Sequence, residues 1–469
     1  MRARLRDVDA PTISIIDQAL AMPVPGAQYQ QAVRSGRWDG KKHLFYVPSS
    51  SFPKGLVSRV CSLLTELKLA YKIVDQRTAV PPPKMERLTA DMLHGISFDA
   101  HNPGGIDYGY QLEAARAALS AGSGILWLAT NAGKTEVACA IIGVLKECRT
   151  LFLVHKKALL SQTRERIAKR FATIEENVGI IGDGRFDPMH VTVATIQSLT
   201  RKTGSKAKRD IIAKYLKTIE LLIIDEGHHT KATTWYRLIN RIPAPYRYIL
   251  SGTPFGSENG LMVEAAVGPV VARISNDALI ELGVSAKPTI TMVPVDEPKL
   301  DVDLPWDQVY KEGIVTNTAR NTLIVRYTAQ LVKAGNPTLI LVKELWHGDL
   351  ISTALTAKKI KHSFVHGRMP MSMVTTEKVR FEDGEISVLI ASPIFDEGVD
   401  VPAIRGLVIA DGGKSIRAVL QKVGRGLRKK VGFNELRIID FADFTHRWLS
   451  QHSYERLAIY EDEGFTVED

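Results

Sequence analysis

The chain has 469 residues, of which 45% are hydrophobic and 24% are charged. This balance is ordinary for a folded protein of roughly two to four domains, and it excludes a chain that is mainly disordered. Lys and Arg outnumber Asp and Glu by 61 to 51. The resulting net charge of +10 is compatible with a polyanionic partner without requiring one.

The cysteines and the N-terminus indicate an intracellular protein. Cys61, Cys139 and Cys148 show no CxxC spacing, so we expect free thiols rather than a disulfide framework or a zinc site. No apolar run reaches the roughly 18 residues of a transmembrane helix. The charged start Met1–Asp9 is unlike a signal peptide. We therefore expect a cytoplasmic protein that contacts no membrane.

Residues 1–85 are predicted to form a small α+β domain that binds DNA. Gly36 and Asp39-Gly40 are turn signals, and an apolar run follows them. The predicted elements are the strand His43–Val47, the helix Ser58–Leu69 and the strand Tyr71–Val74. A stiff proline-rich break follows, and residues 86–104 are predicted to be a linker.

Residues 105–285 are predicted to form an α/β domain, because short apolar strands alternate with amphipathic helices. Runs such as Leu221–Ile224 are continuously apolar, which is typical of a parallel sheet covered on both faces. The predicted strands are Gly124–Ala129, Thr150–Val154, Val191–Thr195, Leu221–Ile224 and Arg247–Leu250, and the helices are Gln111–Ala121, Lys134–Lys146 and Lys157–Phe171.

Residues 286–469 are predicted to form a second α/β domain, because the same alternation restarts after a possible hinge at Gly283-Val284-Ser285. The predicted strands are Thr338–Val342, Ser363–His366, Val388–Ala391, Gly406–Ile409 and Arg437–Phe441. We expect a terminal helix over Trp448–Tyr460 and a solvated acidic tail over Glu461–Asp469. The fold class is therefore α/β, with two tandem parallel-sheet domains and a small N-terminal α+β domain.

A candidate phosphate-binding loop, Ala129–Thr135, lies between a predicted strand and a predicted helix. Backbone N–H groups at a helix N-terminus bind phosphates, so we expect Asn131, Ala132 and Gly133 to line them. Lys134 would bind the β- and γ-phosphates, and the Thr135 hydroxyl would bind Mg²⁺. Leu128 stands where the general pattern has glycine. Taken alone, the segment could also be a helix start that carries this triplet by coincidence.

Asp225 and Glu226 directly follow the buried run Leu221–Ile224. Ligands bind at the carboxyl ends of strands in such sheets. We expect Asp225 to hold Mg²⁺ and Glu226 to orient and polarise the water that attacks a phosphate. Taken alone, the pair could be an acidic loop tip. The phosphate-binding loop earlier in the same α/β unit favours hydrolysis of a nucleotide.

Arg425 and Arg428 lie three residues apart in the second α/β domain, so on a helix they share one face. Both could reach a nucleotide held by the first domain, which is the role of an arginine finger. A basic, solvated helix end is the alternative, since Lys429 and Lys430 follow.

Together these segments resemble the motifs of superfamily 2 helicases and translocases, and further matching segments follow in the same order. The resemblance implies two RecA-like domains that bind ATP and Mg²⁺ between them and move along one strand as they close and reopen. It implies that Gln111 reads adenine and that Arg425 and Arg428 complete the site on closure. It implies nucleotide contacts for Gly398 and Asp400.

The same resemblance implies roles for residues at other positions. The implied nucleic-acid contacts are His155, Lys156, Thr195 and Gln197 in the first domain, and His366, Gly367 and Ser392 in the second. The residues implied to couple hydrolysis to movement along nucleic acid are His228, Ser251, Thr253 and Gln421.

Two segments narrow the resemblance to particular groups of helicases within this superfamily. The box Asp225–His228 resembles the DExH branch more than the DEAD-box RNA helicases. Gly36–Lys41 and Phe52–Leu56 resemble the N-terminal domain of bacteriophage UvsW-type recombination helicases. This implies a phage-encoded enzyme that acts 3′ to 5′ in the host cytoplasm. It would unwind forks and migrate Holliday junctions in recombination, repair or replication. Within the first segment, Trp38 either stacks on a DNA base or packs a small core.

Other functions stay open. A duplex DNA translocase that does not separate strands fits the same motifs, and an RNA helicase is disfavoured only by the N-terminal resemblance. An inactive nucleic-acid clamp is disfavoured by the presence of Lys134, Asp225, Glu226 and both arginines. The basic run Arg201–Arg209 is either a DNA-binding loop or a solvated insertion.

Overall fold

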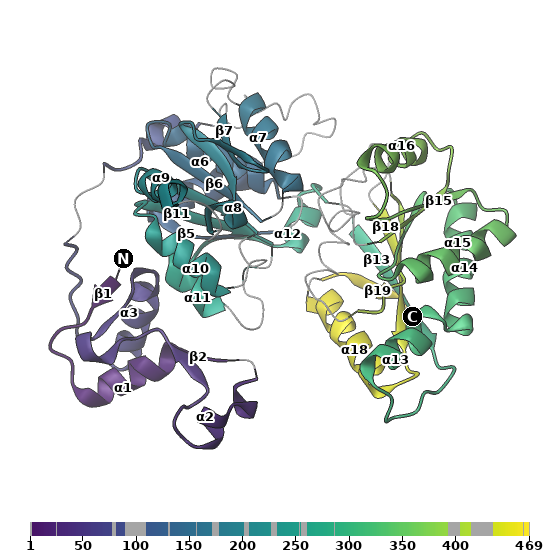
Figure 1. Ribbon diagram of the computed structural model, residues 1–469, viewed down its shortest axis with the longest axis horizontal. Coiled ribbons are helices and arrows are strands. Elements are labelled where there is room, and N and C mark those ends of the chain that lie inside the picture. The colour runs from purple at the N-terminus through teal and green to yellow at the C-terminus, as the bar shows by residue number, and fades with distance from the viewer. Residues whose placement is uncertain are drawn as a thin grey trace. The chain divides into compact units, whose positions relative to one another are not determined.

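The computed structural model describes residues 2–24, 26–76, 81–89, 109–129, 132–155, 157–170, 178–200, 206–226, 232–252, 254, 260–285, 287–392, 404–413, 435–462 and 464–468. The chain divides into two compact units (Figure 1). Unit 1 comprises Met1–Ala129 and Gly133–Ile274, and unit 2 is made up mainly of Ser275–Asp469. Within the described residues, no helix is long and apolar enough to cross a membrane.

The N-terminal part of unit 1, residues 2–76, is called the small domain below. Its strands form two antiparallel pairs, β1 with β4 and β2 with β3. Its strands and α-helices are β1 (Arg2–Arg4), α1 (Ala10–Ala19), β2 (Ala21–Pro23), α2 (Gln31–Arg34), β3 (Lys41–His43), β4 (Ser51–Pro53) and α3 (Val57–Glu66). The core consists of Ile16, Leu20, Leu44, Phe45, Phe52, Leu56, Val60 and Leu64.

Two predicted strands of the small domain are wrong. The strand expected over His43–Val47 ends at His43, because its partner β2 begins at Ala21, directly opposite His43. Tyr71–Val74 is not a strand, and the side chains of Ile73 and Val74 are 63% and 67% exposed. The predicted helix is present as α3.

The rest of unit 1 is built on an eight-stranded sheet in the order β12-β5-β11-β10-β6-β9-β7-β8. All neighbours are parallel except β7 and β8. The strands are β5 (Ser123–Leu128), β6 (Thr150–Val154), β7 (Val178–Gly182), β8 (Arg185–Asp187), β9 (Val191–Thr195), β10 (Leu221–Asp225), β11 (Tyr246–Ser251) and β12 (Val270–Ile274). The predicted strands are all present, and β7, β8 and β12 were not predicted.

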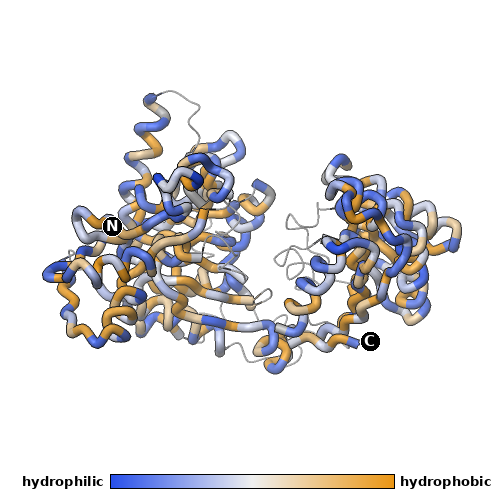
Figure 2. Tube along the Cα trace, turned by 90° about the horizontal axis from the view of Figure 1, so that it is seen from below, coloured by the Kyte–Doolittle hydropathy of each residue, from blue (hydrophilic) through white to orange (hydrophobic). Residues whose placement is uncertain are grey.

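Helices cover both faces of this sheet, as the apolar strands predict. Alternate strand residues such as Leu222 and Ile224 share one core with α8 (Ile196–Thr200), α9 (Lys206–Leu216), α10 (Ala232–Arg241) and α11 (Gly260–Val267). The other helices, α5 (Gly109–Ala121), α6 (Lys134–Val144) and α7 (Ala158–Arg170), pack in sequence, α5 on α6 and α6 on α7. Hydrophobic residues accordingly run through the interior of each unit in Figure 2.

Unit 2 contains a seven-stranded sheet in the order β15-β16-β14-β17-β18-β13-β19, with every pair parallel. The strands are β13 (Lys287–Val295), β14 (Thr338–Leu341), β15 (His362–Val365), β16 (Val388–Ala391), β17 (Gly406–Ile409), β18 (Glu435–Asp443) and β19 (Thr466–Glu468). The helices are α12 (Asn276–Glu281), α13 (Trp306–Tyr310), α14 (Thr318–Lys333), α15 (Leu345–Ala357), α16 (Met371–Glu382) and α18 (Arg447–Asp462).

The fold class predicted from the sequence is confirmed, and one detail of the C-terminus is corrected. The expected terminal helix is α18, which packs on the sheet through Ile459 and Tyr460. The segment expected to be a solvated acidic tail instead contains β19, which pairs with β13 from Thr466 to Glu468. Backbone pairing at a sheet edge needs no particular side chains, so the acidic composition did not reveal it.

Two buried ion pairs attach helices of unit 2 to β18. Arg456 of α18 donates to Asp440 over 2.8 Å, and Arg320 of α14 donates to Asp443 over 2.8 Å. All four side chains are at most 1% exposed. Tyr460 adds a hydrogen bond to Asp440.

Candidate ATP-hydrolysing site and nucleic-acid edge

The N-terminus of α6 places the candidate phosphate-binding residues at the carboxyl edge of the sheet. Gly133 precedes the helix with a left-handed backbone, φ +77°, and a Cβ there would lie 2.3 Å from Nε2 of Gln111. The left-handed backbone favours glycine at this position, and a Cβ would also have to displace the end of the Gln111 side chain. Gln111, 1% exposed, donates to the Tyr110 hydroxyl over 3.2 Å. The structure thus brings the predicted adenine-reading residue against the predicted phosphate loop.

Lys134, Glu226 and Ser251 meet at this edge, although they come from three separate segments. The Lys134 ammonium lies 3.0 Å from one carboxylate oxygen of Glu226, and the Ser251 hydroxyl donates to the other over 2.9 Å. The strand order explains the meeting, because β11 is the only strand between β5 and β10. Glu226 therefore neutralises the lysine that is predicted to bind phosphates.

Glu226 has a left-handed backbone, with φ +47°. This conformation costs a residue with a side chain roughly 1–2 kcal/mol, and such strain tends to gather at functional sites. Its N–H donates to the Leu250 carbonyl over 3.0 Å, so the strained residue is held in place by the neighbouring strand.

Asp225 ends β10 and lies beside this cluster with its Oδ1 atom buried and without a hydrogen-bond partner among the described residues. Burial and then the charge of Glu226 raise the pKa of Asp225 to about 7, and the charge of Lys134 opposes them. For Lys134, burial lowers the pKa, but the charges of Glu226 and Asp225 outweigh it and raise the pKa overall. The lysine therefore stays charged.

The chemistry of Asp225 fits a magnesium ion. The Oδ1 atom of its buried carboxylate has no hydrogen-bond partner among the described residues, and the Thr135 hydroxyl belongs to the first turn of α6 at the same sheet edge. No group of three or more His, Cys, Asp or Glu that could hold a metal occurs in the described part of the chain. A magnesium ion here would thus take its remaining ligands from water and nucleotide phosphates, as this ion commonly does.

The raised pKa of Asp225 gives a stability prediction. A carboxyl whose pKa is higher when folded than when unfolded destabilises the folded state once ionised. This penalty grows between about pH 4 and pH 7 and is complete above it. We expect Asp225→Asn to raise the melting temperature of the nucleotide-free protein at pH 8 by about 2 °C or more. We expect no comparable gain at pH 5.

Thermal melts at the two pH values test this prediction. Asp183→Asn is the control, because Asp183 pairs with Lys157 on the surface and its side chain is 72% exposed. A loss of stability in Asp225→Asn at pH 8 would contradict the prediction.

Three residues predicted to contact nucleic acid lie farther along the same edge, after β6 and β9. Gln197 is exposed and donates to the His155 carbonyl over 2.9 Å, so these two predicted contacts are neighbours. Thr195 is only 1% exposed, and its hydroxyl lies 2.7 Å from that of Ser198 and accepts from the Ser198 N–H. Its side chain caps α8 and faces inward. Only the backbone of Thr195 is therefore available to contact a nucleic-acid strand.

The matching residues of unit 2 lie at the carboxyl edge of its own sheet. His366 and Gly367 follow β15, and Ser392 follows β16. The Ser392 N–H donates to the Val365 carbonyl over 3.2 Å, and the His366 ring packs beside Phe364 at 5.1 Å. The structure therefore brings these three predicted residues together within the unit.

Comparison with known proteins identifies the family. Residues 107–256 match the family model "Type III restriction enzyme, res subunit", and residues 320–430 match "Helicase conserved C-terminal domain". Together the two models cover more than half of the chain. The chain is a superfamily 2 helicase. As such it is an ATP-hydrolysing enzyme, and its two parallel-sheet units are RecA-like.

Two curated relatives match this helicase over most of their length. The "DNA 3'-5' translocase XPB2" of Sulfurisphaera tokodaii is 27% identical over 68% of this chain and 78% of its own. The "ATP-dependent DNA helicase uvsW" of Enterobacteria phage T4 is 21% identical over 98% of this chain and 95% of its own. The helicase spans only about half of some other relatives.

Among solved structures, Saccharomyces cerevisiae Dbp5 bound to RNA and ADP BeF3 has a TM-score of 0.53 and 15% identity. It covers 82% of the helicase and 95% of its own chain. At this identity the likeness concerns the fold alone.

Several predicted site residues of the helicase lie outside the described residues. They are Asn131, Lys156, His228, Thr253, Gly398, Asp400, Gln421, Arg425 and Arg428. Trp38 is described and half-buried, and its indole N–H donates to the Lys41 carbonyl over 2.8 Å. This contact fixes the ring within its own turn.

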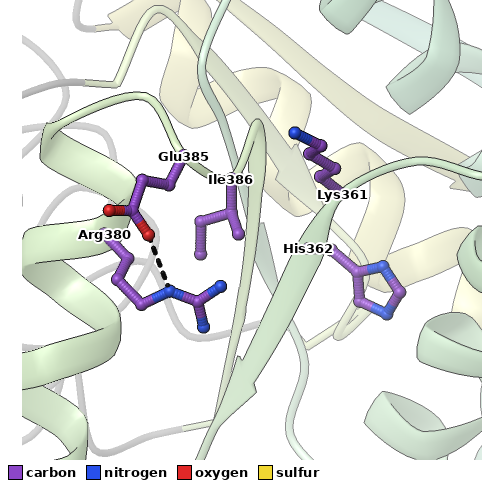
Figure 3. Close-up of a pocket in the computed structure, with 5 residues that line it drawn as sticks. All are labelled: Lys361, His362, Arg380, Glu385 and Ile386. Carbon is purple, nitrogen blue, oxygen red and sulfur yellow. Dashed lines mark hydrogen bonds and ion pairs between the residues drawn. The ribbon is translucent and has the colours of Figure 1, made fainter.

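A pocket of about 490 Å³ lies in unit 2, away from the helicase motifs (Figure 3). Its lining residues stand at the amino ends of β15 and β16 and in the last turn of α16, opposite the edge that carries His366 and Ser392. Figure 3 shows Arg380 turned toward Glu385, its partner at 3.0 Å, and His362 on the other side of its strand. The arginine of this pocket is therefore already paired.

The sequence did not reveal that charged residues of α6 and α7 lie next to the site. Glu136, in the first turn of α6, pairs with Arg170 of α7 over 2.6 Å and is 8% exposed. Arg166 of the same helix adds positive charge that lowers the pKa of Asp225 against the larger effect of burial. The basic residues of α7 were visible in the sequence, but their partners are distant along the chain and only the fold reveals them.

Proposed function

We propose that this helicase uses ATP to remodel branched DNA, by unwinding forks and migrating Holliday junctions in phage recombination, repair or replication. The observation that carries the proposal is the similarity to the T4 DNA helicase along 98% of the chain, small domain included. We also propose that the helicase moves 3′ to 5′, and the translocase relative, which is named for 3'-5' movement, supports this polarity. We further propose a cytoplasmic location and the domain division at residues 85, 104 and 285.

In the first step of the proposed mechanism, Lys134 leaves Glu226 and binds the phosphates of ATP. In the nucleotide-free site, Glu226 holds the lysine at 3.0 Å. When triphosphate arrives, Lys134 turns to the β- and γ-phosphates, and one carboxylate oxygen of Glu226 becomes available to accept a proton from the attacking water. Ser251 keeps the other oxygen oriented. Binding of the nucleotide thus frees Glu226 to act as the general base in the hydrolysis of that nucleotide.

The remaining residues complete the proposed site. Gln111 reads adenine, and Asp225 and Thr135 hold Mg²⁺, which neutralises phosphate charge when bound. Arg425 and Arg428 stabilise the charge of the transition state in the closed form. Gly398 and Asp400 contact the nucleotide. His228, Thr253 and Gln421 couple the site to the DNA.

The exposed surface of α9 supports a nucleic-acid partner. Lys206, at the start of the helix, is exposed and forms no ion pair with described residues. A crossover helix between parallel strands runs back along them, so α9 begins near the edge that carries Gln197. Lys206 is in the first turn of α9, and an uncompensated lysine beside a nucleic-acid edge suits phosphate contacts. This favours the DNA-binding interpretation of the adjoining basic run.

A duplex translocase without strand separation is the second candidate, favoured by the name of the archaeal relative. Steady-state ATPase with single-stranded DNA, duplex, four-way junction and RNA tests the proposal. We expect the strongest stimulation by forked or four-way DNA, followed by strand separation and branch migration. Stimulation by RNA alone would overturn the proposal. Duplex stimulation without strand separation would select the translocase.

A further inference from the structure

The small domain does not close its own hydrophobic core. Its buried residues pack against Met262 and Ala265 of α11, a helix of the RecA-like part of unit 1. These two side chains are 2% and 3% exposed. In Figure 1 the small domain, in purple, lies beside α10 and α11. The small domain is therefore not a module on a tether, since its core is completed by the motor.

Two further contacts fix this attachment. A Cβ on Gly55 would lie 2.1 Å from the Glu264 carbonyl oxygen, so the two backbones are in direct contact. Arg59 of α3 grips the Glu264 carboxylate with Nη2 and Nε, at 2.6 Å and 3.0 Å from Oε2. Glu264 is 6% exposed although charged, and it forms an ion pair with Arg59 across the interface. We call the Arg59–Glu264 pair the clamp.

The other face of α11 packs on the strands that lead into the ATP site. Val263, Ala266 and Val267 share a core with Ile125 of β5 and Ile249 of β11. Strand β11 ends at Ser251, which binds Glu226, and the carbonyl of the next residue, Gly252, accepts from Trp127 of β5 over 2.9 Å. The helix α11 is thus buried on both faces, between the small domain and the groups that sense nucleotide.

We propose that the clamp is a coupling element, which makes the small domain move as one body with α11 and so converts a nucleotide-driven shift of β11 into displacement of DNA held by the small domain. This inference rests on the proposed function. Arg59 and Glu264 are positioning residues in it, because they lie outside the ATP site. Packed cores transmit such shifts because they have little room to deform.

Coupling is measured as the number of junction or fork substrates remodelled per ATP hydrolysed. We expect Arg59→Ala and Glu264→Gln each to lower this ratio roughly 5-fold or more, as for a typical coupling between sites. Basal ATPase should be unchanged. The double variant Arg59→Glu with Glu264→Arg should recover part of the ratio. Arg59→Lys, which keeps the charge but loses the two-pronged grip, should give an intermediate ratio.

Arg87→Ala is the matched control, since Arg87 pairs with Glu147 over 2.7 Å elsewhere on unit 1. Melting curves identify any variant that fails to fold. A wild-type ratio in folded Arg59→Ala and Glu264→Gln would overturn the inference. If the wild-type protein acts on RNA and not on DNA, the proposed function is wrong, but the inference about the clamp is still open to test. The number of RNA strands displaced per ATP hydrolysed then measures coupling in the same variants.

Discussion

Replacing Glu226 by glutamine is expected to lower the rate of ATP hydrolysis by about 10²–10⁴-fold, the usual contribution of a positioned general base. Nucleotide affinity should be kept or increased, because the carboxylate that competes with phosphate for Lys134 is gone. Turnover assays and titration with a fluorescent ATP analogue measure the two effects separately.

The control for this experiment is Glu136→Gln. Glu136 is also a buried carboxylate near the start of α6, but it pairs with Arg170 and has no place in the proposed chemistry. Turnover per folded molecule should therefore persist in that variant. Near-normal hydrolysis by Glu226→Gln would contradict the assigned role.

Replacing Arg456 by methionine should have the largest effect on stability. The arginine is fully buried and donates to Asp440 and to the carbonyls of Phe441 and Gly413. Its removal leaves the buried Asp440 carboxylate without its cation, which typically costs about 3–5 kcal/mol. Urea denaturation of the full chain, followed by tryptophan fluorescence, measures the loss.

A surface pair in the same unit provides the comparison. Arg380 pairs with Glu377 and Glu385, but its side chain is 42% exposed, so Arg380→Met should change the unfolding free energy by no more than about 1 kcal/mol. Adding Asp440→Asn to Arg456→Met should restore part of the lost stability. Equal effects of the two single variants would show that burial does not set the energy of these pairs.

The central strands could be predicted from the sequence because burial on both faces leaves a continuous apolar run. Thr150–Val154, Val191–Thr195 and Val388–Ala391 have the bounds that were predicted. Edge strands carry a weaker signal, as in β12, where no residue is fully buried. Conversely, Tyr71–Val74 has strand-forming residues but is no strand, because pairing depends on a partner elsewhere in the chain.

The candidate site likewise has features that could be predicted from the sequence and features that could not. Residue types and their place after apolar strands indicated Lys134, Asp225 and Glu226, and the fold places all three at one sheet edge. Their roles in hydrolysis stay predictions. The Lys134–Glu226 ion pair and the raised pKa of Asp225 could not be predicted, since both depend on strand order and burial. The inward-facing hydroxyl of Thr195 was equally invisible in the sequence.

The short strand β19 has a consequence for handling the protein. It covers the outer side of β13, a nine-residue strand whose other side is occupied by β18. Without residues 466–468, part of that side would present unpaired backbone N–H and C=O groups, which can template the addition of strands from other molecules. The edge of the sheet is thus a strand of only three residues instead of the nine-residue β13, and a shortened chain that lacks it would be expected to self-associate more readily even with its motor intact.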